Sequence, residues 1–276
     1  TLVTGVQTCA LPILKFKMKE YFDFSFLHKF GKAFKVFDDQ DSGNICFGVN
    51  NGNEKLFIKF AGAPTSEYSG EPIDAINTLK STVPLYQTIH HKCLIEYIDS
   101  FEISNGFAMI FRWADGKCMG RMYDSHKEIM ALPIKTKLKI FSDITNFVES
   151  IINQGYIAID FYDGSIMYDT ITEKTTICDI DYFRKLPTKN DMGKMFGSDR
   201  FLSPEEKVLG AELDETTNVY TLGQMAFSLF TDSDRKKENW VLNRESYDVL
   251  IKAISPEKRN RYRTIKEFSD HWNMAL

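Results

Sequence analysis

The stretch FGSDRFLSPEE, residues 196–206, is the most informative part of this 276-residue sequence. Downstream of it, the chain is apolar on nearly every side from Asn218 to Phe230, which predicts a buried central helix. Apolar residues at helical spacing predict further helices on both sides of the stretch. The predicted helices span residues 134–153, 218–230, 247–254 and 264–272. The second part of the chain is therefore expected to be mainly helical.

The first part of the chain carries a different pattern. The turn-rich runs DDQDSGN (38–44) and NNGNEK (50–55) separate short apolar stretches, which is typical of hairpins. A helix is predicted at about residues 71–89, with Pro84 as a kink or boundary. Strands are predicted at residues 34–37, 45–49, 56–60, 94–102 and 107–113, with shorter β-rich pieces at 166–168 and 175–178. A β-rich first part and a helical second part predict an α+β architecture.

Composition excludes several classes of protein. Hydrophobic residues make up 43% of the chain, enough for a full core, and the formal net charge is only -4. Such a charge gives no reason to expect nucleic acid or an anionic membrane as a partner. No apolar run approaches the roughly 18 residues of a spanning helix. The five cysteines are scattered, so neither a disulfide framework nor a zinc site is predicted. A cytoplasmic location is expected.

The first 13 residues, TLVTGVQTCALPI, look like a translated sequencing-adapter oligonucleotide. They lack the basic start and the long apolar stretch of a secretory signal. We expect residues 1–13 to be a non-native segment, with a natural start near Met18.

Four short segments resemble the motifs of protein kinases, in the same order along the chain: LFIKF (56–60), QGYIAIDFYDGSIMYD (154–169), TTICDIDYFRK (175–185) and FGSDRFLSPEE (196–206). The resemblance implies a two-lobed protein kinase-like fold, with a small antiparallel β-rich N-lobe and a larger, mainly helical C-lobe. The expected boundaries are 14–113 for the N-lobe with its lead-in and 114–276 for the C-lobe, the two forming one kinase-like domain.

The last segment resembles the end of a kinase activation segment. Its Ser-Pro-Glu triplet would be an anchor, with Glu205 in a buried ion pair to Arg261, or alternatively to Arg259. NVYTLG (218–223) resembles the start of the kinase central helix, where Asn218 keeps an acceptor oxygen for backbone N–H groups. Small-molecule kinases of the aminoglycoside type lack the Ser-Pro-Glu segment, so the resemblance favours the protein-kinase branch.

LFIKF places Lys59 in the third strand, at the position of the kinase lysine that grips the α- and β-phosphates. The alternative is a solvated lysine on a strand edge. The glutamate that usually pairs with this lysine is missing, because Thr82 stands at its position. Glu71 or Asp74 would be a substitute from an earlier turn.

QGYIAIDFYDGSIMYD resembles the catalytic loop. Asp160 would be the base that accepts or orients a hydroxyl proton, unless it merely caps a loop. Ala158 and Ile159 replace the usual His and Arg, and Tyr162 replaces a lysine. Ser165 stands at the position of the metal-binding Asn, where it would be a poorer ligand for a hard cation, and it is a candidate cofactor-binding residue.

TTICDIDYFRK resembles the metal-binding segment, which makes Asp179 the candidate Mg²⁺ ligand. Asp181 replaces a glycine. Glycine can adopt backbone angles that a Cβ atom disfavours, and aspartate adopts those angles more readily than most residues. A second carboxylate from Asp181, or one from Asp163, would compensate for Ser165 in holding the metal.

The phosphate-covering loop is eroded, since only Gly43 remains of three expected glycines. Asp38, Asp39 and Asp41 would bring negative charge toward a triphosphate, so a solvated acidic hairpin tip is the alternative interpretation. In the connector, the chain from Arg112 to Ala114 would offer backbone groups to an adenine.

The connector also carries Asp115, which would reach a ribose hydroxyl. The combined prediction is ATP- and Mg²⁺-dependent phosphotransfer to Ser or Thr hydroxyls of a protein substrate. A pseudokinase that binds nucleotide or a partner protein is the alternative, and a small-molecule kinase is a third. Fold alone does not decide among them.

Overall fold

The computed structural model describes residues 17–103 and 105–276, so the adapter-like segment 1–13 lies outside the described residues. The chain divides into two compact units. The first comprises the described residues up to Thr88 together with Ile95–Ala114. The second comprises Ile89–Leu94 and Asp115–Leu276.

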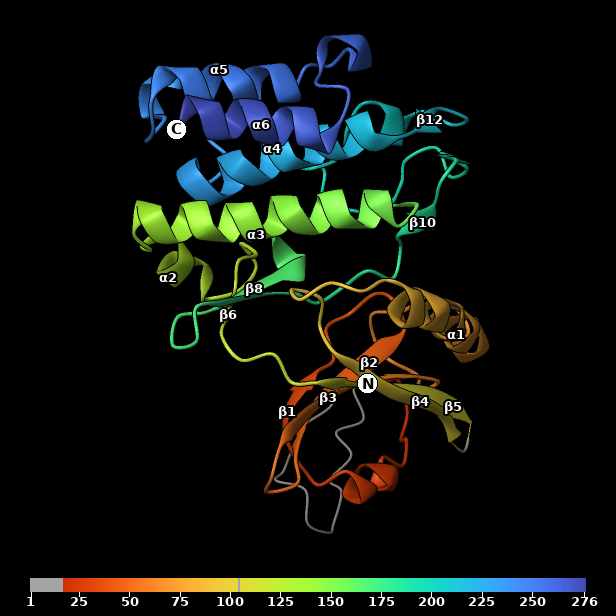
Figure 1. Ribbon diagram of the computed structural model, residues 1–276. Coiled ribbons are helices and arrows are strands. Elements are labelled where there is room, and N and C mark those ends of the chain that lie inside the picture. The colour runs from red at the N-terminus through yellow and green to blue at the C-terminus, as the bar shows by residue number, and fades with distance from the viewer. Residues whose placement is uncertain (1–16, 104) are drawn as a thin grey trace. The chain divides into compact units, whose positions relative to one another are not determined.

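An antiparallel five-stranded sheet forms the framework of the first unit (Figure 1). Its strand order is β1-β2-β3-β5-β4, and each strand corresponds to a predicted one. The bounds are β1 Lys32–Phe37, β2 Asn44–Asn50, β3 Lys55–Ala61, β4 Tyr97–Ile103 and β5 Gly106–Arg112. The strand predicted at 94–102 begins three residues later than predicted, at Tyr97. Leu94 instead forms an isolated parallel bridge with Ile177 of the second unit, and Ile95 and Glu96 lie outside any strand.

The β2–β3 hairpin shows how local sequence fixes the sheet. Asn50 Oδ1 accepts the Gly52 N–H at 2.8 Å, and Asn51 Oδ1 accepts the Asn53 N–H at 2.9 Å. Gly52 has φ +96°, a conformation that glycine adopts without a steric penalty. These bonds make the turn predicted at NNGNEK and set the register Asn50↔Lys55.

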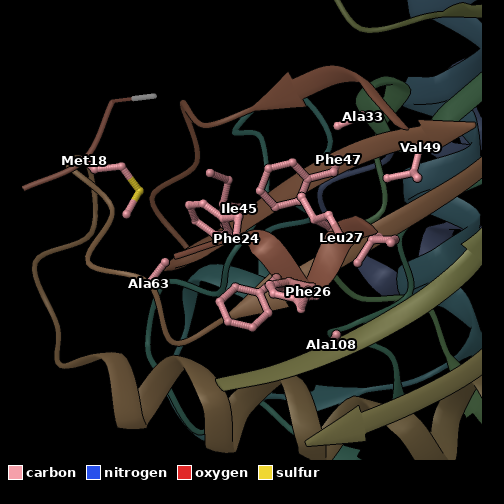
Figure 2. Packing of buried hydrophobic residues seen from close by; sticks show 12 residues of the cluster. Met18, Phe24, Phe26, Leu27, Ala33, Ile45, Phe47, Val49, Ala63 and Ala108 are labelled. Atoms are coloured by element: carbon pink, nitrogen blue, oxygen red, sulfur yellow. The ribbon is translucent and has the colours of Figure 1, made fainter. Parts of the chain in front are cut away.

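The core of the first unit includes residues that precede the sheet in the sequence. Phe24 and the helical turn η1 (Ser25–Lys29) bring aromatic rings onto the strands (Figure 2). The Phe24 ring lies 5.1 Å from that of Phe47 and 6.0 Å from that of Phe60. This cluster comprises Met18, Phe24, Phe26, Leu27, Ala33, Ile45, Phe47, Val49, Ile58, Phe60, Ala63 and Ala108.

Helix α1 (Pro72–Thr88) contains Pro84 well inside its span, so the proposed boundary there is wrong. A proline removes one backbone hydrogen bond of a helix, but packing of the buried face offsets that loss. Tyr86, two residues further on, is buried with its ring 4.9 Å from that of Phe111 on β5. The helix therefore continues past the proline to pack on the sheet.

The second unit is built mainly from helices, and the predicted ones are all present (Figure 1). Side-chain caps start three of them: Asp214 for α4, Asn243 for α5 and Thr264 for α6. The bounds are α2 His126–Met130, α3 Ile134–Asn153, α4 Glu215–Thr231, α5 Arg244–Ala253 and α6 Ile265–Ala275. The Phe141 ring of α3 lies 6.3 Å from Phe268 and 5.1 Å from Trp272 of α6, so aromatic packing joins these helices.

Short strands connect the helices of the second unit. A three-stranded sheet of order β6-β8-β9 contains both predicted short β pieces. Two further strand pairs, β7 with β10 and β11 with β12, flank the loops that carry the kinase-like segments. The bounds are β6 Lys117–Cys118, β7 Tyr156–Ile157, β8 Ile166–Asp169, β9 Lys174–Ile177, β10 Arg184–Lys185, β11 Thr188–Lys189 and β12 Glu212–Leu213. Within residues 17–103 and 105–276, no helix has both the length and the apolar composition needed to cross a bilayer.

Candidate catalytic and nucleotide site

The Ser-Pro-Glu segment is anchored as predicted by a buried ion pair. Arg261 Nη1 lies 2.7 Å from Glu205 Oε1, and Nη2 lies 3.0 Å from Oε2, a bidentate arrangement. Thr217 of α4 also donates to Glu205 Oε1 at 2.9 Å. Burial opposes ionisation of Glu205, but the Arg261 guanidinium outweighs it and holds the pKa of this carboxyl below its ordinary value. The segment is thus fixed to the helical core.

Asn218 holds the catalytic-loop segment to the central helix α4. Its Oδ1 accepts the N–H of Ala158 at 2.9 Å, which confirms the predicted acceptor role. Its Nδ2 also donates to the carbonyl oxygen of Ala158 at 2.7 Å, a bond that the sequence did not indicate. An amide satisfies both backbone groups of Ala158, whereas a carboxylate accepts only. The replacement of Asp by Asn therefore suits this contact.

Asp160 follows two residues after this attachment and adopts a left-handed backbone with φ +56°. Aspartate tolerates this region, and such residues gather at functional sites. Gly197, of the FGSDRFLSPEE stretch, approaches it closely with φ +130°. A Cβ atom at Gly197 would lie 3.4 Å from Asp160 Oδ1, an ordinary contact, so it is the positive φ that favours a glycine where the two segments meet.

Tyr162 is under the influence of both predicted acidic groups of the second unit, Asp160 and Asp179. Burial is the main cause that raises the pKa of its hydroxyl, and the negative charges of Asp160 and Asp179 add to the increase. Both carboxylates therefore act on the same buried hydroxyl. Tyr162 occupies the position of the usual lysine, so a neutral group stands there in place of a cation.

Asp179 is exposed two residues after the end of β9, and its Oδ1 accepts the Asp181 N–H at 3.2 Å. Asp181 is not among the described residues with positive φ, so this position does not need the freedom of a glycine. Among the described residues, no group of three or more His, Cys, Asp or Glu side chains is arranged to hold a metal ion. Magnesium binding by Asp179 and Asp181 stays a prediction.

Asp163, the third predicted metal ligand, has surroundings that differ from those of a metal site. It is fully buried, and Arg200 Nη2 lies 3.0 Å from its Oδ1 and 2.9 Å from its Oδ2. Ser228 Oγ of α4 donates to Oδ2 at 3.0 Å. Both carboxylate oxygens are engaged, so Asp163 ties the catalytic-loop segment to Arg200 and to α4.

Ser165, predicted near nucleotide and metal, is also buried. Its amide donates to the Tyr162 carbonyl at 3.0 Å, and its carbonyl accepts the Cys178 amide at 2.8 Å. The 3₁₀ turn η2 (Asp163–Ser165) is thereby bonded to the chain just before Asp179. A nucleotide contact of Ser165 stays a prediction.

Lys59 lies in the middle of β3, opposite Cys46 of β2 and Met109 of β5. It is only 8% exposed, which rules out a solvated lysine on a strand edge. Thr82 of α1 is buried close to the same strands, donating its hydroxyl to Leu79 O at 2.8 Å and lying 3.4 Å from Met109 Sδ. Phosphate binding by Lys59 stays a prediction.

Gly43 has a packing role in the first unit. It has φ +77°, and an added Cβ would lie 2.7 Å from Ala75 Cβ and 2.8 Å from the Tyr68 ring. The acidic turn before it is contacted by Lys17, whose backbone N–H donates to Asp38 at 2.7 Å and whose ammonium pairs with Asp39. This turn therefore recruits a cation from the chain itself.

The connector residues are partly committed to the sheet of the first unit. The Arg112 amide donates to Glu96 O at 2.9 Å, and the Trp113 amide donates to Lys55 O at 3.0 Å. The Arg112 guanidinium, moreover, pairs with Glu96 and Glu54. The amide of Arg112 is therefore not a donor for adenine. Contacts of Ala114 and Asp115 with a nucleotide stay predictions.

Two residues of the FGSDRFLSPEE stretch were missed by the sequence reasoning. Arg200 has the role described above, and Glu206 is only 3% exposed. Ser203 donates to Glu206 Oε2 from both its N–H and its hydroxyl, each at 2.8 Å. Burial raises the pKa of Glu206 to about 7. The sequence did contain one signal for Glu206: it follows Glu205 directly, in a segment expected to be anchored in the core, so a second buried carboxylate could have been predicted there.

Comparisons with known proteins agree with this arrangement. No protein-family model matches the chain. The chain is 24% identical over 223 residues to the serine/threonine-protein kinase nekl-2 of Caenorhabditis elegans, covering 78% of this chain and 59% of that protein. It is 22% identical over 160 residues to a probable serine/threonine-protein kinase of Dictyostelium discoideum, covering 58% of this chain and 37% of that protein.

The strand-rich first unit and the helical second unit are those of the two-lobed α+β protein kinase-like fold. The two sequence relatives, both serine/threonine protein kinases by name, support the predicted resemblance to the protein kinase-like superfamily. The chain spans little more than half the length of nekl-2 and about a third of the Dictyostelium relative.

Proposed function

We propose that this chain transfers the γ-phosphoryl group of ATP to a Ser or Thr hydroxyl of a protein substrate, with Mg²⁺ as cofactor. The observation that carries the proposal is the frame around Asp160: the Asn218–Ala158 bonds on one side and the Glu205–Arg261 anchor of the stretch that contacts it. These contacts fix the backbone on both sides of Asp160, and a general base acts on a substrate hydroxyl only when its carboxylate is held in position.

In this proposal Asp160 orients the acceptor hydroxyl and takes its proton as the oxygen attacks the γ-phosphorus. Lys59 holds the phosphates, and Asp179, with Asp181 beside it, provides the carboxylates for magnesium. The metal supplies charge neutralisation at the phosphates when bound. Ala114 and Asp115 contact the nucleoside part.

A pseudokinase is the second candidate function, and specific observations favour it. Gly43 is packed against Ala75 and Tyr68, and the Arg112 amide donates a hydrogen bond to Glu96 O. Asp163 forms an ion pair with Arg200. These contacts leave fewer groups for a nucleotide than a complete kinase site has. A small-molecule kinase has less support, because the Ser-Pro-Glu anchor is present.

The relatives' names support a protein substrate or partner, and ATP follows from the same proposal. We further propose lobes at 14–113 and 114–276, and a cytoplasmic location. No observation supports nucleic acid as a partner, given the net charge of -4.

The test combines nucleotide binding with phosphotransfer. Thermal unfolding is measured with ATP, with and without Mg²⁺, and transfer from labelled ATP is measured for the wild type, Asp160→Asn and Asp179→Asn. Asp270→Asn, in an exposed ion pair with Lys266 on α6, is the matched control. We expect magnesium-dependent stabilisation by ATP, and transfer that both site variants abolish and the control retains.

Binding without transfer would establish the pseudokinase alternative. Transfer that survives both Asp160→Asn and Asp179→Asn would refute the residue roles, because the proposal leaves no other base or metal ligand in their place.

A further inference from the structure

A small cavity lies directly against Asp160, within the second unit. It has about 10 Å³ of space for the centre of a water molecule, close to the lower limit for holding one. Four polar residues line it: Asp160, Ser198, Glu206 and Thr221. The other lining residues are Phe161, Gly197, Phe201 and Leu202. A buried water needs two to four polar partners, and this cavity offers that number.

Glu206 is one of the residues that line this space. Both bonds from Ser203 end on its Oε2, and a carboxylate can accept further bonds at its second oxygen, Oε1. Thr221 donates its own hydroxyl hydrogen to Thr217 O at 3.2 Å, so its oxygen is left to accept. A water here can therefore bond to Glu206 Oε1, Thr221 Oγ1 and the Asp160 carboxylate together.

We propose that one water molecule in this cavity joins Asp160 to Glu206, and that the proton Asp160 takes from a substrate hydroxyl passes through this water to Glu206. The proton transfer rests on the proposed phosphotransfer, whereas the water bridge does not. The cavity lies where two of the kinase-like segments, 154–169 and 196–206, meet helix α4 at Thr221, and the resemblance to kinases assigns no role to Glu206.

The step balances in atoms and electrons. The substrate O–H bond breaks as its oxygen bonds to the γ-phosphorus, and the electrons of the cleaved P–O bond leave with ADP. The hydroxyl proton goes to Asp160, the water takes it and gives one of its own protons to Glu206 Oε1. After the product leaves, the proton returns to solvent by the reverse route.

The electrostatics favour this direction. Burial of Glu206 and the nearby negative charge of Glu205 raise the proton affinity of its carboxylate, while the bonds from Ser203 and the charge of Arg261 lower it. The net effect puts the pKa of Glu206 at about 7, above that of an ordinary aspartate. Asp160 lines the same cavity, so the water between them gives a proton on Asp160 a short route to this raised-pKa carboxylate.

The bridge is tested on the full chain by ¹³C NMR of labelled Glu side-chain carboxyls over pH 4–9. Glu206→Gln assigns the resonance, since the amide keeps an acceptor for Ser203. We expect this resonance to titrate near pH 7. Asp160→Asn, which removes the charge across the cavity, should lower the midpoint by roughly one pH unit. Asp179→Asn removes a carboxylate that does not line the cavity and should leave the midpoint in place. An unchanged midpoint in Asp160→Asn would overturn the bridge.

Kinetics test the proton transfer separately. The wild-type kcat should rise as pH passes 7, when Glu206 becomes able to accept a proton. Glu206→Gln should lose this rise and reduce kcat about tenfold, with KM for ATP unchanged. Transfer with an unaltered pH profile in Glu206→Gln refutes the proton step and leaves the proposed function standing. No transfer in the wild type, with a coupled Glu206 titration, refutes the proposed function and leaves the water bridge standing.

Discussion

The two units hold their functional segments by different means. In the second unit, buried polar pairs fix the loops: Glu205 with Arg261, Asp163 with Arg200, and Asn218 with the backbone of Ala158. In the first unit, the polar contacts of the loop before β2 are exposed, with Lys17 bonded to Asp38 and paired with Asp39, and the buried contact of this loop is the close packing of Gly43 against Ala75 and Tyr68.

The difference shows that hydrogen-bonded ion pairs and apolar packing determine different properties of a loop. Hydrogen-bonded ion pairs set the position and orientation of a loop, so the second unit can hold Asp160 in a left-handed conformation. Contact packing sets only proximity. The loop of the first unit is therefore built for closeness to α1, and a phosphate-covering role is added only if the proposed function holds.

The largest expected effect comes from breaking the Glu205–Arg261 pair. Arg261→Ala leaves a buried carboxylate without its partner, which costs about 3–5 kcal/mol of unfolding free energy. Urea denaturation followed by circular dichroism measures it. Lys266→Ala, which removes a partner from an exposed pair on α6, is the control and should give no measurable change. Equal effects of the two variants would contradict a special role of the buried pair.

A pH dependence of stability should follow from Glu206. Its pKa rises from an ordinary 4.5 to about 7 on folding, so its contribution to stability is fully present below pH 4.5 and is lost as pH rises to 7. The loss amounts to about 3 kcal/mol. Glu206→Gln lacks this titration, so its stability relative to the wild type should increase from pH 5 to pH 8 in urea unfolding. A constant difference would show that Glu206 does not titrate in this range.

The first unit is tested by Gly43→Ala. The methyl group meets Ala75 and Tyr68 at less than 3.0 Å and the positive φ is strained, so we expect a loss of about 2 kcal/mol. Gly52→Ala has a positive φ as well but meets nothing within 4 Å, and it should cost about half as much. Thermal unfolding compares the two variants. Equal losses would remove the packing explanation for Gly43.

The smallest effect is expected from Asn218→Asp, which restores the residue usual in the kinase motif. The carboxylate still accepts the Ala158 N–H but cannot donate to the Ala158 carbonyl, which leaves that buried oxygen unsatisfied. We expect a loss of about 1–2 kcal/mol in urea unfolding at pH 7. A gain in stability would mean that the amide is not needed to hold the catalytic-loop segment.

Much of the fold could be predicted from periodicity and turn chemistry. The helix at 134–153 was predicted with the bounds that the structure gives it, because its apolar stripe is regular along the whole length. The Glu205–Arg261 pair was found through the family resemblance. The boundary proposed at Pro84 was wrong because local propensity favours a helix end at a proline, whereas the packing of Tyr86 against Phe111 of the sheet favours a helix that continues to Thr88.

The site was less predictable because its contacts join residues far apart in sequence. Asp163 is separated from Arg200 by 37 positions, and no pattern within either segment shows that they meet. Gly43 resembles a phosphate-loop glycine in sequence, yet its role depends on how closely α1 approaches. Long-range contacts of single polar residues are therefore what sequence reasoning lacked.

The outer strands of the five-stranded sheet have a consequence for self-association. Among the described residues, β1 and β4 form its edges, and an exposed edge can recruit a strand from another molecule. Each has an irregular register, between Ala33 and Lys35 in β1 and between Tyr97 and Asp99 in β4. Exposed lysines on β1 and acidic residues on β4 add charge along these edges. Both features oppose edge-to-edge aggregation at the concentrations used for spectroscopy or crystallisation.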